Sequence, residues 1–271
     1  GQSLIAPSKG QNGFLYHIVA NQVKHLDVDK MEYIKRDARA CGLSQGGFDT
    51  DTRRILNNAR VIDGVICYNH KVYEDIYNLF QTRYRLHTTV YRHPAVVATH
   101  HMISDALVSS GLPLRESIDD IDSFCKYDDT IIDTLRNSTL SKTTREIIHR
   151  IDTRDLYKVV VTCKRSKPWL KNPTTRDLLD IANKDAEVIP PDRIVIECSC
   201  VGFTGKADGH PMDSLRFYDG SSPSKSFSVK RTSVSTLLAA RYCEYWTRIL
   251  VKDSKYTDSA ISAFDAWKAS I

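Results

Sequence analysis

The chain has 271 residues, of which 41% are hydrophobic and 26% are charged, and its formal net charge is +5 at pH 7. These proportions are ordinary for a globular protein. No apolar run approaches the roughly 18 residues that a membrane-spanning helix needs, and the N-terminus lacks the apolar core of a signal peptide. We expect an intracellular protein with no membrane contact. Because no dense basic cluster marks nuclear import, the sequence does not decide between the nucleus and the cytoplasm.

The cysteines and the charge exclude some functions and leave others open. Seven cysteines without regular spacing indicate reduced thiols and not a disulfide framework. Cys198 and Cys200 should alternate along a strand, with both thiols on one face, but a metal site there would need further ligands. The mildly basic pI of about 8.7 fits an anionic ligand such as a nucleotide, or weak attraction to nucleic acid, and decides neither.

The segment from Leu26 to Asp37 carries polar residues at helical spacing. If it is helical, Asp29, Tyr33 and Asp37 fall at i, i+4 and i+8 and share one face, with Lys30 beside them. Two acids, a phenol and a lysine are suited to bind a metal ion, a sugar hydroxyl and a phosphate. The alternative is an ordinary solvated face of an amphipathic helix.

A second helix, predicted from Tyr73 to Tyr91, presents another polar column. Arg83, His87 and Tyr91 again fall at i, i+4 and i+8. The planar guanidinium of arginine suits phosphate oxygens, and histidine can donate, accept or transfer a proton near neutral pH. If the two columns face each other, they would suit a polyphosphate ester that carries a sugar.

The other elements before residue 155 are short helices, turns and one hairpin. Residues 1–13 are expected to be a flexible lead-in. Asp63-Gly64 is a turn signal for a hairpin over residues 60–68. His100 and His101 are adjacent on a predicted helix, so they cannot face one metal ion. A helix that ends at Leu56 is expected after the turn Ser44–Gly47, with Asp49 or Asp51 as its cap. Another is expected over residues 95–109, after Pro94. Further helices are expected over residues 14–23, 117–127, 130–137 and 141–151.

From residue 156 the composition turns to β-branched runs, which predict strands. These strands are expected over 156–161, 193–198, 215–218 and 227–230, followed by helices over 236–251 and 258–271. The sequence therefore predicts a mainly α fold, with a helical domain over residues 14–155 and a small α+β lobe over residues 156–271.

Three segments resemble a known family, in the same order along the chain. They are FLYHIVANQVKHLDVDKMEYIKRD, YNLFQTRYRLHTTVYRH and IDTRDLYKVV. Together they closely resemble the SAM-and-HD-domain dNTP triphosphohydrolases. The resemblance runs from about Phe14 to Lys158 and continues more weakly to the C-terminus. It implies that residues 14–155 form the C-terminal part of an HD-domain-like helical bundle.

The resemblance also implies an activity and roles for the two polar columns. In the family, water attacks the α-phosphorus of a dNTP and releases a deoxynucleoside and triphosphate, which regulates the dNTP pool. The metal site contains a His, a His-Asp dipeptide and a later Asp, and the metal would be a divalent ion such as Fe, Zn, Mn or Mg. By resemblance, the metal ligand is Asp29, the catalytic residues are Asp29, Arg83 and His87, and the substrate-binding residues are Lys30, Tyr33, Asp37, Arg83, His87 and Tyr91.

The sequence departs from the family pattern at the metal site. None of the nine histidines is followed by Asp. One carboxylate is not a site for a transition metal. We therefore expect this chain to be the C-terminal half of the catalytic domain, completed by an N-terminal half in another segment or chain. The alternative is a form with no metal chemistry.

A second departure concerns activating nucleotides, which the family binds between subunits. By resemblance, effector-binding residues are Arg54, Lys71, Arg154 and Lys158. Where the family has further basic residues, this chain has Asn69, Thr89, Pro94 and Gly220. Each charge-assisted hydrogen bond contributes about 1.5–3 kcal/mol, so activation by GTP or a dNTP should be weakened. Arg154 and Lys158 are also compatible with an ordinary i, i+4 helix face.

Three functional hypotheses follow. The first is a metal-dependent dNTP triphosphohydrolase, to which this chain supplies one metal carboxylate and much of the nucleotide pocket. The second is a non-catalytic relative that binds nucleotide or single-stranded nucleic acid, or regulates an active homologue by oligomerising with it. The third is a purely structural assembly subunit. The partners expected are a dNTP, the N-terminal half of the HD domain and further subunits in a homo- or hetero-oligomer, either a dimer or a tetramer.

Overall fold

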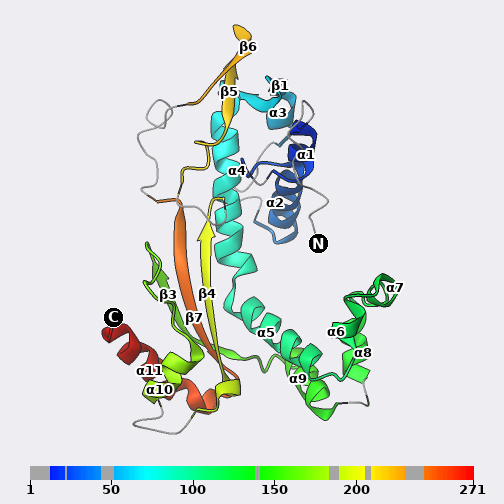
Figure 1. The fold of residues 1–271 in the computed structure, drawn as a ribbon, viewed down its shortest axis with the longest axis vertical. Coiled ribbons are helices and arrows are strands. Elements are labelled where there is room, and N and C mark those ends of the chain that lie inside the picture. The colour runs from blue at the N-terminus through cyan, green and yellow to red at the C-terminus, as the bar shows by residue number, and fades with distance from the viewer. Residues whose placement is uncertain are drawn as a thin grey trace. The chain divides into compact units, whose positions relative to one another are not determined.

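The computed structural model describes residues 13–21, 23–43, 52–137, 139, 141–182, 189–204, 209–229 and 241–271 (Figure 1). The chain forms two compact units. The first comprises Gly1–Val90, Arg165–Lys167 and Cys200–Tyr245, and the second comprises Tyr91–Lys164, Pro168–Ser199 and Trp246–Ile271. In the described part of the chain, no helix is long and apolar enough to cross a membrane. The predicted domain boundary at residue 155 stays a prediction, because both units draw on interleaved segments.

The first unit combines four helices and a sheet within the described residues. The helices are α1 (Phe14–Val19), α2 (Val28–Ala40), α3 (Thr52–Asn57) and α4 (Tyr73–Leu86). The sheet contains β1 (Ala59–Ile62), β2 (Val65–Asn69), β5 (Arg216–Asp219) and β6 (Ser222–Phe227). Both polar segments singled out in the sequence are therefore helical, and α2 packs beside α4 (Figure 1).

Local sequence explains where α2 begins and which face it buries. The Asp27 side chain accepts a hydrogen bond from the Lys30 amide, which caps the first turn. Met31, Ile34 and Ala38 are buried at spacings of three and four residues. The polar residues of α2 are thereby left on its other faces. The predicted helix over 14–23 is shorter, since α1 ends at Val19.

The sheet of the first unit has the order β1-β2-β5-β6. The predicted hairpin is confirmed: β1 pairs antiparallel with β2, and Asp63 and Gly64 have φ values of 51° and 72°. Strand β2 pairs in parallel with β5, which brings residues 67–69 beside residues 216–218. The predicted strand over 227–230 is wrong, because β6 ends at Phe227 and Lys230 lies outside the described residues.

The helix predicted from Tyr73 to Tyr91 is not uniform. The α-helix ends at Leu86, and residues His87–Tyr91 form a π-helical segment with a wider turn. The hydroxyls of Thr88 and Thr89 both donate to the Arg85 carbonyl oxygen, at 2.9 and 2.8 Å. Side-chain bonds to the backbone of this kind perturb a helix. The i, i+4, i+8 column of Arg83, His87 and Tyr91 therefore does not continue in α-helical register.

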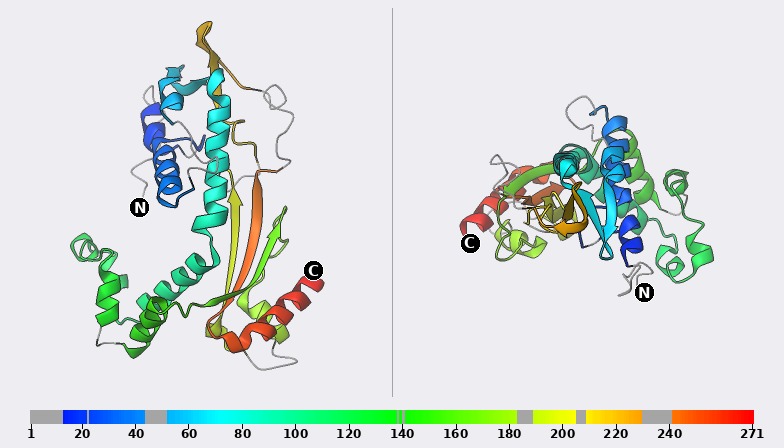
Figure 2. Two further views of the ribbon diagram at one scale, coloured as in Figure 1. Left: turned by 180° about the vertical axis from the view of Figure 1, so that it is seen from behind. Right: turned by 90° about the horizontal axis from the view of Figure 1, so that it is seen from above.

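The second unit surrounds a three-stranded sheet of order β3-β7-β4. Its strands are β3 (Lys158–Arg165), β7 (Cys243–Val251) and β4 (Ile194–Gly202). One face packs on α10 (Thr175–Ala182) and α11 (Thr257–Ala269), through Ile249 and Val251 of β7. The opposite face packs, through Leu250, on α5 (Pro94–Val108) and α9 (Lys142–Asp152). Helices α5 and α9 lie side by side (Figure 2).

Several local predictions in the second unit are confirmed. Pro94 is the first residue of α5, where its missing N–H is harmless. The Ser141 hydroxyl caps α9 by accepting from the Thr144 amide at 3.2 Å. Helix α8 (Ile131–Asn137) and the C-terminal helix α11 match the predicted segments, and Cys198 and Cys200 lie two residues apart on β4.

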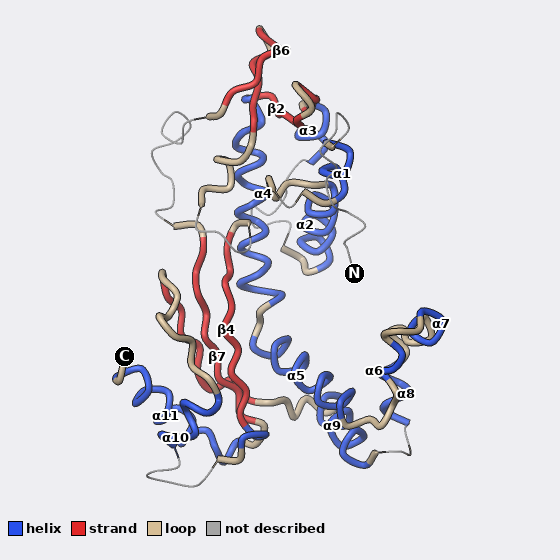
Figure 3. Tube along the Cα trace, viewed as in Figure 1, coloured by secondary structure: helices blue, strands red, loops and turns tan. Residues whose placement is uncertain are grey.

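Three predictions in this part of the chain are wrong or incomplete. Residues 243–251 form β7, and not the end of a predicted helix, while 236–240 lie outside the described residues (Figure 3). Residues 246–251 of this central strand are buried in succession, polar ones included, so the segment lacks the polar–apolar alternation that marks a strand. The helix predicted over 117–127 is two short helices, α6 (Leu114–Ser117) and α7 (Ile121–Phe124).

The third is helix α10, which was not predicted although the sequence carries an N-terminal capping signal for it. The Thr174 hydroxyl accepts from the Asp177 amide, and the Asp177 carboxylate accepts from the Thr174 amide. This is a capping box, with Asp in the place of the usual Glu. The predicted lead-in up to residue 12, the turn Ser44–Gly47 and the caps Asp49 and Asp51 lie outside the described residues.

Candidate functional site

Within the first unit, α2 and α4 bring together three of the predicted site residues. Lys30, Tyr33 and Arg83 are half-buried. Tyr33 hydrogen-bonds Arg83; burial raises the pKa of the Tyr33 phenol, and the guanidinium opposes that rise. The Tyr33 phenol and the Arg83 guanidinium therefore meet where the two helices pack, and the Lys30 ammonium lies near enough for both cations to act on His25.

Asp27, which the sequence analysis did not single out, holds Lys30 in place. Its side chain is 5% exposed, and Oδ2 lies 3.2 Å from the Lys30 Nζ. The same carboxylate accepts from the amides of Asn21 and Lys30, each at 3.0 Å. Because the acid is buried and fully used, it fixes the ammonium at the beginning of α2. An Asp directly before a predicted helix is a common N-cap, so the sequence carried a signal for Asp27.

Arg83 is anchored by backbone carbonyls that are distant in the sequence. Its Nη1 donates to the Gly202 carbonyl oxygen at 2.6 Å and to that of Phe203 at 3.3 Å. A side chain at Gly202 would come within 2.7 Å of the Tyr242 carbonyl oxygen, so this close approach requires glycine. The buried Arg83 Nε has no hydrogen-bond partner among the described residues. An unused buried donor is a candidate contact for a ligand.

A second residue missed in the sequence is His25. It is half-buried, adopts a φ of 58°, and lies close enough to Lys30 and Arg83 for both cations to lower its pKa. Burial is the larger cause of that lowering, and Asp27 opposes it. No sequence pattern pointed to this residue, because its backbone conformation and its neighbours depend on the tertiary structure.

The remaining predicted residues are placed differently. Asp29 is exposed on the first turn of α2. Asp37 is half-buried and pairs with the neighbouring Arg36, whose Nε lies 3.1 Å from Oδ1. His87 is half-buried in the π-helical segment, and Tyr91 belongs to the second unit.

The described residues do not by themselves fit a metal ion. Nowhere among them do three or more His, Cys, Asp or Glu side chains gather. Asp29 is therefore a single carboxylate, and Asp27 is committed to Lys30 and two amides. His100 and His101, both on α5, belong to no such group either. A transition metal requires several nitrogen, oxygen or sulfur donors at one point.

Two predicted effector residues line a cavity of about 470 Å³ in the first unit. Arg54 pairs with Asp75, and its Nη2 donates to the Lys71 carbonyl oxygen at 3.2 Å. Asn69, in the place of a family basic residue, is buried and accepts from the Lys71 amide at 3.1 Å. This asparagine therefore has a structural role in the turn before α4. Gly220 lies beside it, since a Cβ there would be 3.7 Å from the Asn69 amide nitrogen.

The other two predicted effector residues, Arg154 and Lys158, line a larger cavity, of about 730 Å³, in the second unit. Helix α9 ends at Asp152, Arg154 has a φ of 64°, and Lys158 begins β3. The alternative that these two cations form an i, i+4 helix face is therefore wrong. Pro94 also lines this cavity, whereas Thr89 is exposed in the π-helical segment.

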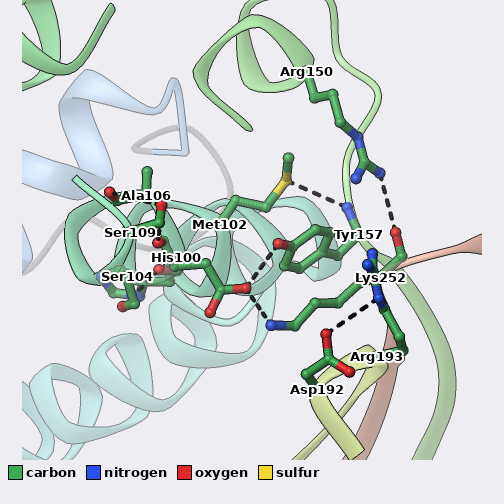
Figure 4. A network of polar contacts seen from close by, with 11 residues as sticks. His100, Met102, Ser104, Ala106, Ser109, Arg150, Tyr157, Asp192, Arg193 and Lys252 are labelled. Atoms are coloured by element: carbon green, nitrogen blue, oxygen red, sulfur yellow. Dashed lines mark hydrogen bonds and ion pairs between the residues drawn. The ribbon is translucent and has the colours of Figure 1, made fainter. Parts of the chain in front are cut away.

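The same cavity holds cations that the sequence analysis did not single out. Arg150, Arg193 and Lys252 line it together with Arg154 and Lys158. Figure 4 shows how Lys252 is held: the Asp105 carboxylate accepts from its ammonium and, at 2.7 Å, from the Tyr157 hydroxyl. Burial and the Asp105 carboxylate both raise the pKa of Tyr157.

Comparison with known proteins identifies the family. The family described as "HD associated region" matches residues 50–191, more than half of the chain. The deoxynucleoside triphosphate triphosphohydrolase SAMHD1 homolog of Dictyostelium discoideum is 29% identical over 263 residues, which cover 94% of this chain and 49% of that protein. The SAMHD1 enzymes of Homo sapiens and Bos taurus are each 30% identical, cover 97% and 95% of this chain, and are covered to 46% and 48%.

The chain thus spans about half the length of the curated relatives it matches. The match nevertheless runs through both compact units, and it includes the helices that carry Lys30, Tyr33 and Arg83. The chain belongs to the family of SAM-and-HD-domain dNTP triphosphohydrolases.

Proposed function

We propose that this chain takes part in the hydrolysis of deoxynucleoside triphosphates, releasing a deoxynucleoside and triphosphate. The observation that carries the proposal is the convergence of Lys30, Tyr33 and Arg83 between α2 and α4. The relatives of this chain are named as enzymes of that activity. An ammonium and a guanidinium held in fixed positions suit the phosphates of a nucleotide.

The roles proposed for the side chains are binding and orientation. Lys30 would neutralise phosphate charge, because the buried Asp27 keeps its ammonium at one place. Arg83 would offer its remaining donors to phosphate oxygens, and Tyr33 and Asp37 would contact the sugar. His87 and Tyr91 are proposed as further substrate contacts. In the bound state such fixed donors require little reorganisation when charge develops on the phosphates.

A divalent metal ion would supply an activated water in this family of reactions. Asp29 is the only predicted ligand in this chain, and the described residues do not fit a metal site by themselves. No His-Asp dipeptide occurs in the 271 residues. We therefore propose that a further segment or chain, corresponding to the N-terminal part of the HD domain, supplies the other ligands. Residues 14–155 would then be the C-terminal part of the HD-like bundle, followed by the α+β lobe.

The proposed activity is tested by measuring triphosphate release from each dNTP with Mg²⁺ or Mn²⁺ present, for the protein alone and with its co-purifying partner. Lys30→Ala and Arg83→Ala should each lower the rate at least tenfold, since each removes a charge-assisted contact of about 1.5–3 kcal/mol. Lys35→Ala is the matched control, because Lys35 is exposed on the same helix. If both site variants keep the wild-type rate, the pocket is misassigned.

A second candidate function is nucleotide binding that regulates an active homologue. The sequence lacks the His-Asp dipeptide, and the two cation-lined cavities are suited to phosphate groups. We propose Arg54 and Lys71 for one effector site, and Arg154 and Lys158 for another. Sedimentation of the protein with and without GTP tests this: nucleotide-dependent assembly without hydrolysis supports the regulatory function. Binding of single-stranded nucleic acid without any metal would also favour it.

A further inference from the structure

The turn before α2 is fixed by hydrogen bonds that do not depend on any ligand. The Asn21 side chain accepts from the Lys24 amide at 2.9 Å and donates to the Leu26 carbonyl oxygen at 3.2 Å. The Asn21 amide donates to Asp27, and the His25 amide donates to the Asn21 carbonyl oxygen at 2.8 Å. Both Asn21 and Asp27 are buried. The position of His25 is therefore set by a closed network on either side of it.

His25 occupies a backbone conformation that glycine adopts more easily. Its φ of 58° lies in the left-handed region, and only two other non-glycine residues in the described part of the chain share this property, Asp63 and Arg154. A side chain retained in such a conformation, where glycine would be less strained, suggests that the side chain has a use. Asp63 sits in an exposed hairpin turn, whereas His25 is half-buried beside Lys30 and Arg83 of the candidate site.

The surroundings of His25 are those of an anion site. Lys30 from α2 and Arg83 from α4 are the cations close enough to affect it, and Asp27 is the acid. Asp27 is already paired with Lys30, at 3.2 Å. Arg83 keeps its buried Nε without a partner among the described residues. Two cations thus act on the imidazole, and the acid that acts on it, Asp27, is already paired; Asp29 acts on the neighbouring Tyr33.

We propose that His25 is a third phosphate contact of this site, beside Lys30 and Arg83. The inference rests on the proposed function, since it assigns a further residue to the same nucleotide pocket. His25 lies in the turn before α2, so it would contact the phosphates from a different element than Lys30 on α2 and Arg83 on α4. The ligand class is a polyphosphate ester, or inorganic polyphosphate.

Such a contact couples binding to proton uptake. In the free protein, burial, Lys30 and Arg83 lower the pKa of His25, which disfavours the charged imidazolium. A bound polyphosphate offsets both cations and adds negative charge, which raises the pKa of His25 in the complex. Affinity therefore increases as the pH falls through the pKa of the complex, and levels off below the lower pKa of the free protein.

The test is the pH dependence of binding of inorganic tripolyphosphate, measured by calorimetry at pH 6 and pH 8. His25→Gly removes the imidazole but fits the backbone conformation. We expect it to fold at least as stably as the wild type, to bind about tenfold more weakly at pH 6, and to differ little at pH 8. Asp63→Gly is the matched control, because it relieves the same backbone conformation outside the pocket. It should leave affinity at both pH values unchanged.

The comparison with Lys30→Ala separates this inference from the proposed function. If Lys30→Ala loses tripolyphosphate binding while His25→Gly keeps the wild-type affinity and pH profile, the pocket stands and the role of His25 is refuted. If the wild type binds no tripolyphosphate at either pH, both proposals fail. Should His25→Gly not fold, His25→Asn gives the same readout, because asparagine tolerates the left-handed conformation. A shift of the His25 imidazole pKa upward on binding, followed by NMR, would be direct support.

Discussion

Each compact unit places a lysine beside an aspartate in a candidate anion site, and the two pairs differ in burial. In the first unit, the side chain of Asp27 is 5% exposed and that of Lys30 is 18% exposed. In the second unit, Asp105 is 32% exposed and Lys252 is 17% exposed. Asp27 also caps a helix and accepts from two amides, whereas Asp105 accepts from the Tyr157 hydroxyl. The first pair is therefore needed to form α2, whereas the second pair lies at the edge of a cavity.

The difference in burial determines how strongly each site contributes to the stability of its unit. In the first unit, cations are held by a buried acid and by backbone carbonyls, so the site is preorganised, and the acid that holds Lys30 is also the cap of α2. In the second unit, Arg154 and Lys158 form no ion pair within the described residues. The second site should therefore tolerate substitution, and its changes should be visible mainly in ligand binding.

The largest effect is expected from Asp27→Ala. The change removes an N-cap and leaves Lys30 and the Asn21 amide without their partner, so we expect the free energy of unfolding to fall by about 3 kcal/mol. Denaturant unfolding measures this directly. Asp29→Ala, two residues further along the same helix and exposed, should change it by less than about 1 kcal/mol. If both variants lowered the free energy of unfolding equally, Asp27 would not have the special structural role that distinguishes the first unit.

Asp105→Asn is the counterpart in the second unit. It breaks a partly exposed ion pair with Lys252 but keeps an acceptor for Tyr157, so we expect a loss of about 1 kcal/mol. Without the carboxylate, the pKa of Tyr157 should move down, which ultraviolet titration of the phenol detects. Asp122→Asn, an exposed position elsewhere in this unit, is the control. A loss as large as that of Asp27→Ala would contradict the comparison.

A smaller, pH-dependent effect is expected from Asp177 at the beginning of α10. The Lys171 ammonium, followed by the hydroxyl and the amide of Thr174, lowers the pKa of this carboxyl to about 2. Its contribution to stability is therefore complete above the unfolded value near 3.9, and is lost as the pH falls from there to about 2. Because solvent screens the pair, we expect no more than about 1 kcal/mol. Asp177→Asn should flatten stability over this pH range, and an unchanged profile would refute the assignment.

The smallest effect is expected from Arg154→Gly, and it should be stabilising. The φ of 64° at Arg154 is less strained for glycine than for arginine. Relief of this strain should outweigh the greater entropy of the unfolded glycine variant, so we expect the free energy of unfolding to rise by about 0.5 kcal/mol. Thermal unfolding measures the change, and phosphate binding to the second cavity should weaken at the same time. A destabilised variant would show that the Arg154 side chain makes contacts needed by the fold.

Local sequence was sufficient wherever a helix or turn carries its own signals. The periodicity of α2, the Asp63-Gly64 turn, Pro94 at the beginning of α5 and the Ser141 cap were each predicted and confirmed. The capping box of α10 was present and was not used. The matched family segments also gave the correct family. The roles of Asp29, Asp37, His87 and Tyr91 stay predictions.

Contacts between residues far apart in the chain could be seen only in the folded structure. Most helices and the polar residues of α2 and α4 could be predicted from the sequence, because caps and apolar periodicity act over a few residues. Only the fold revealed that Arg83 is anchored by Gly202, that Asp105 holds Lys252, and that β2 pairs with β5. It also made residues 243–251 a central strand, because burial on both faces, and not local propensity, fixes that segment.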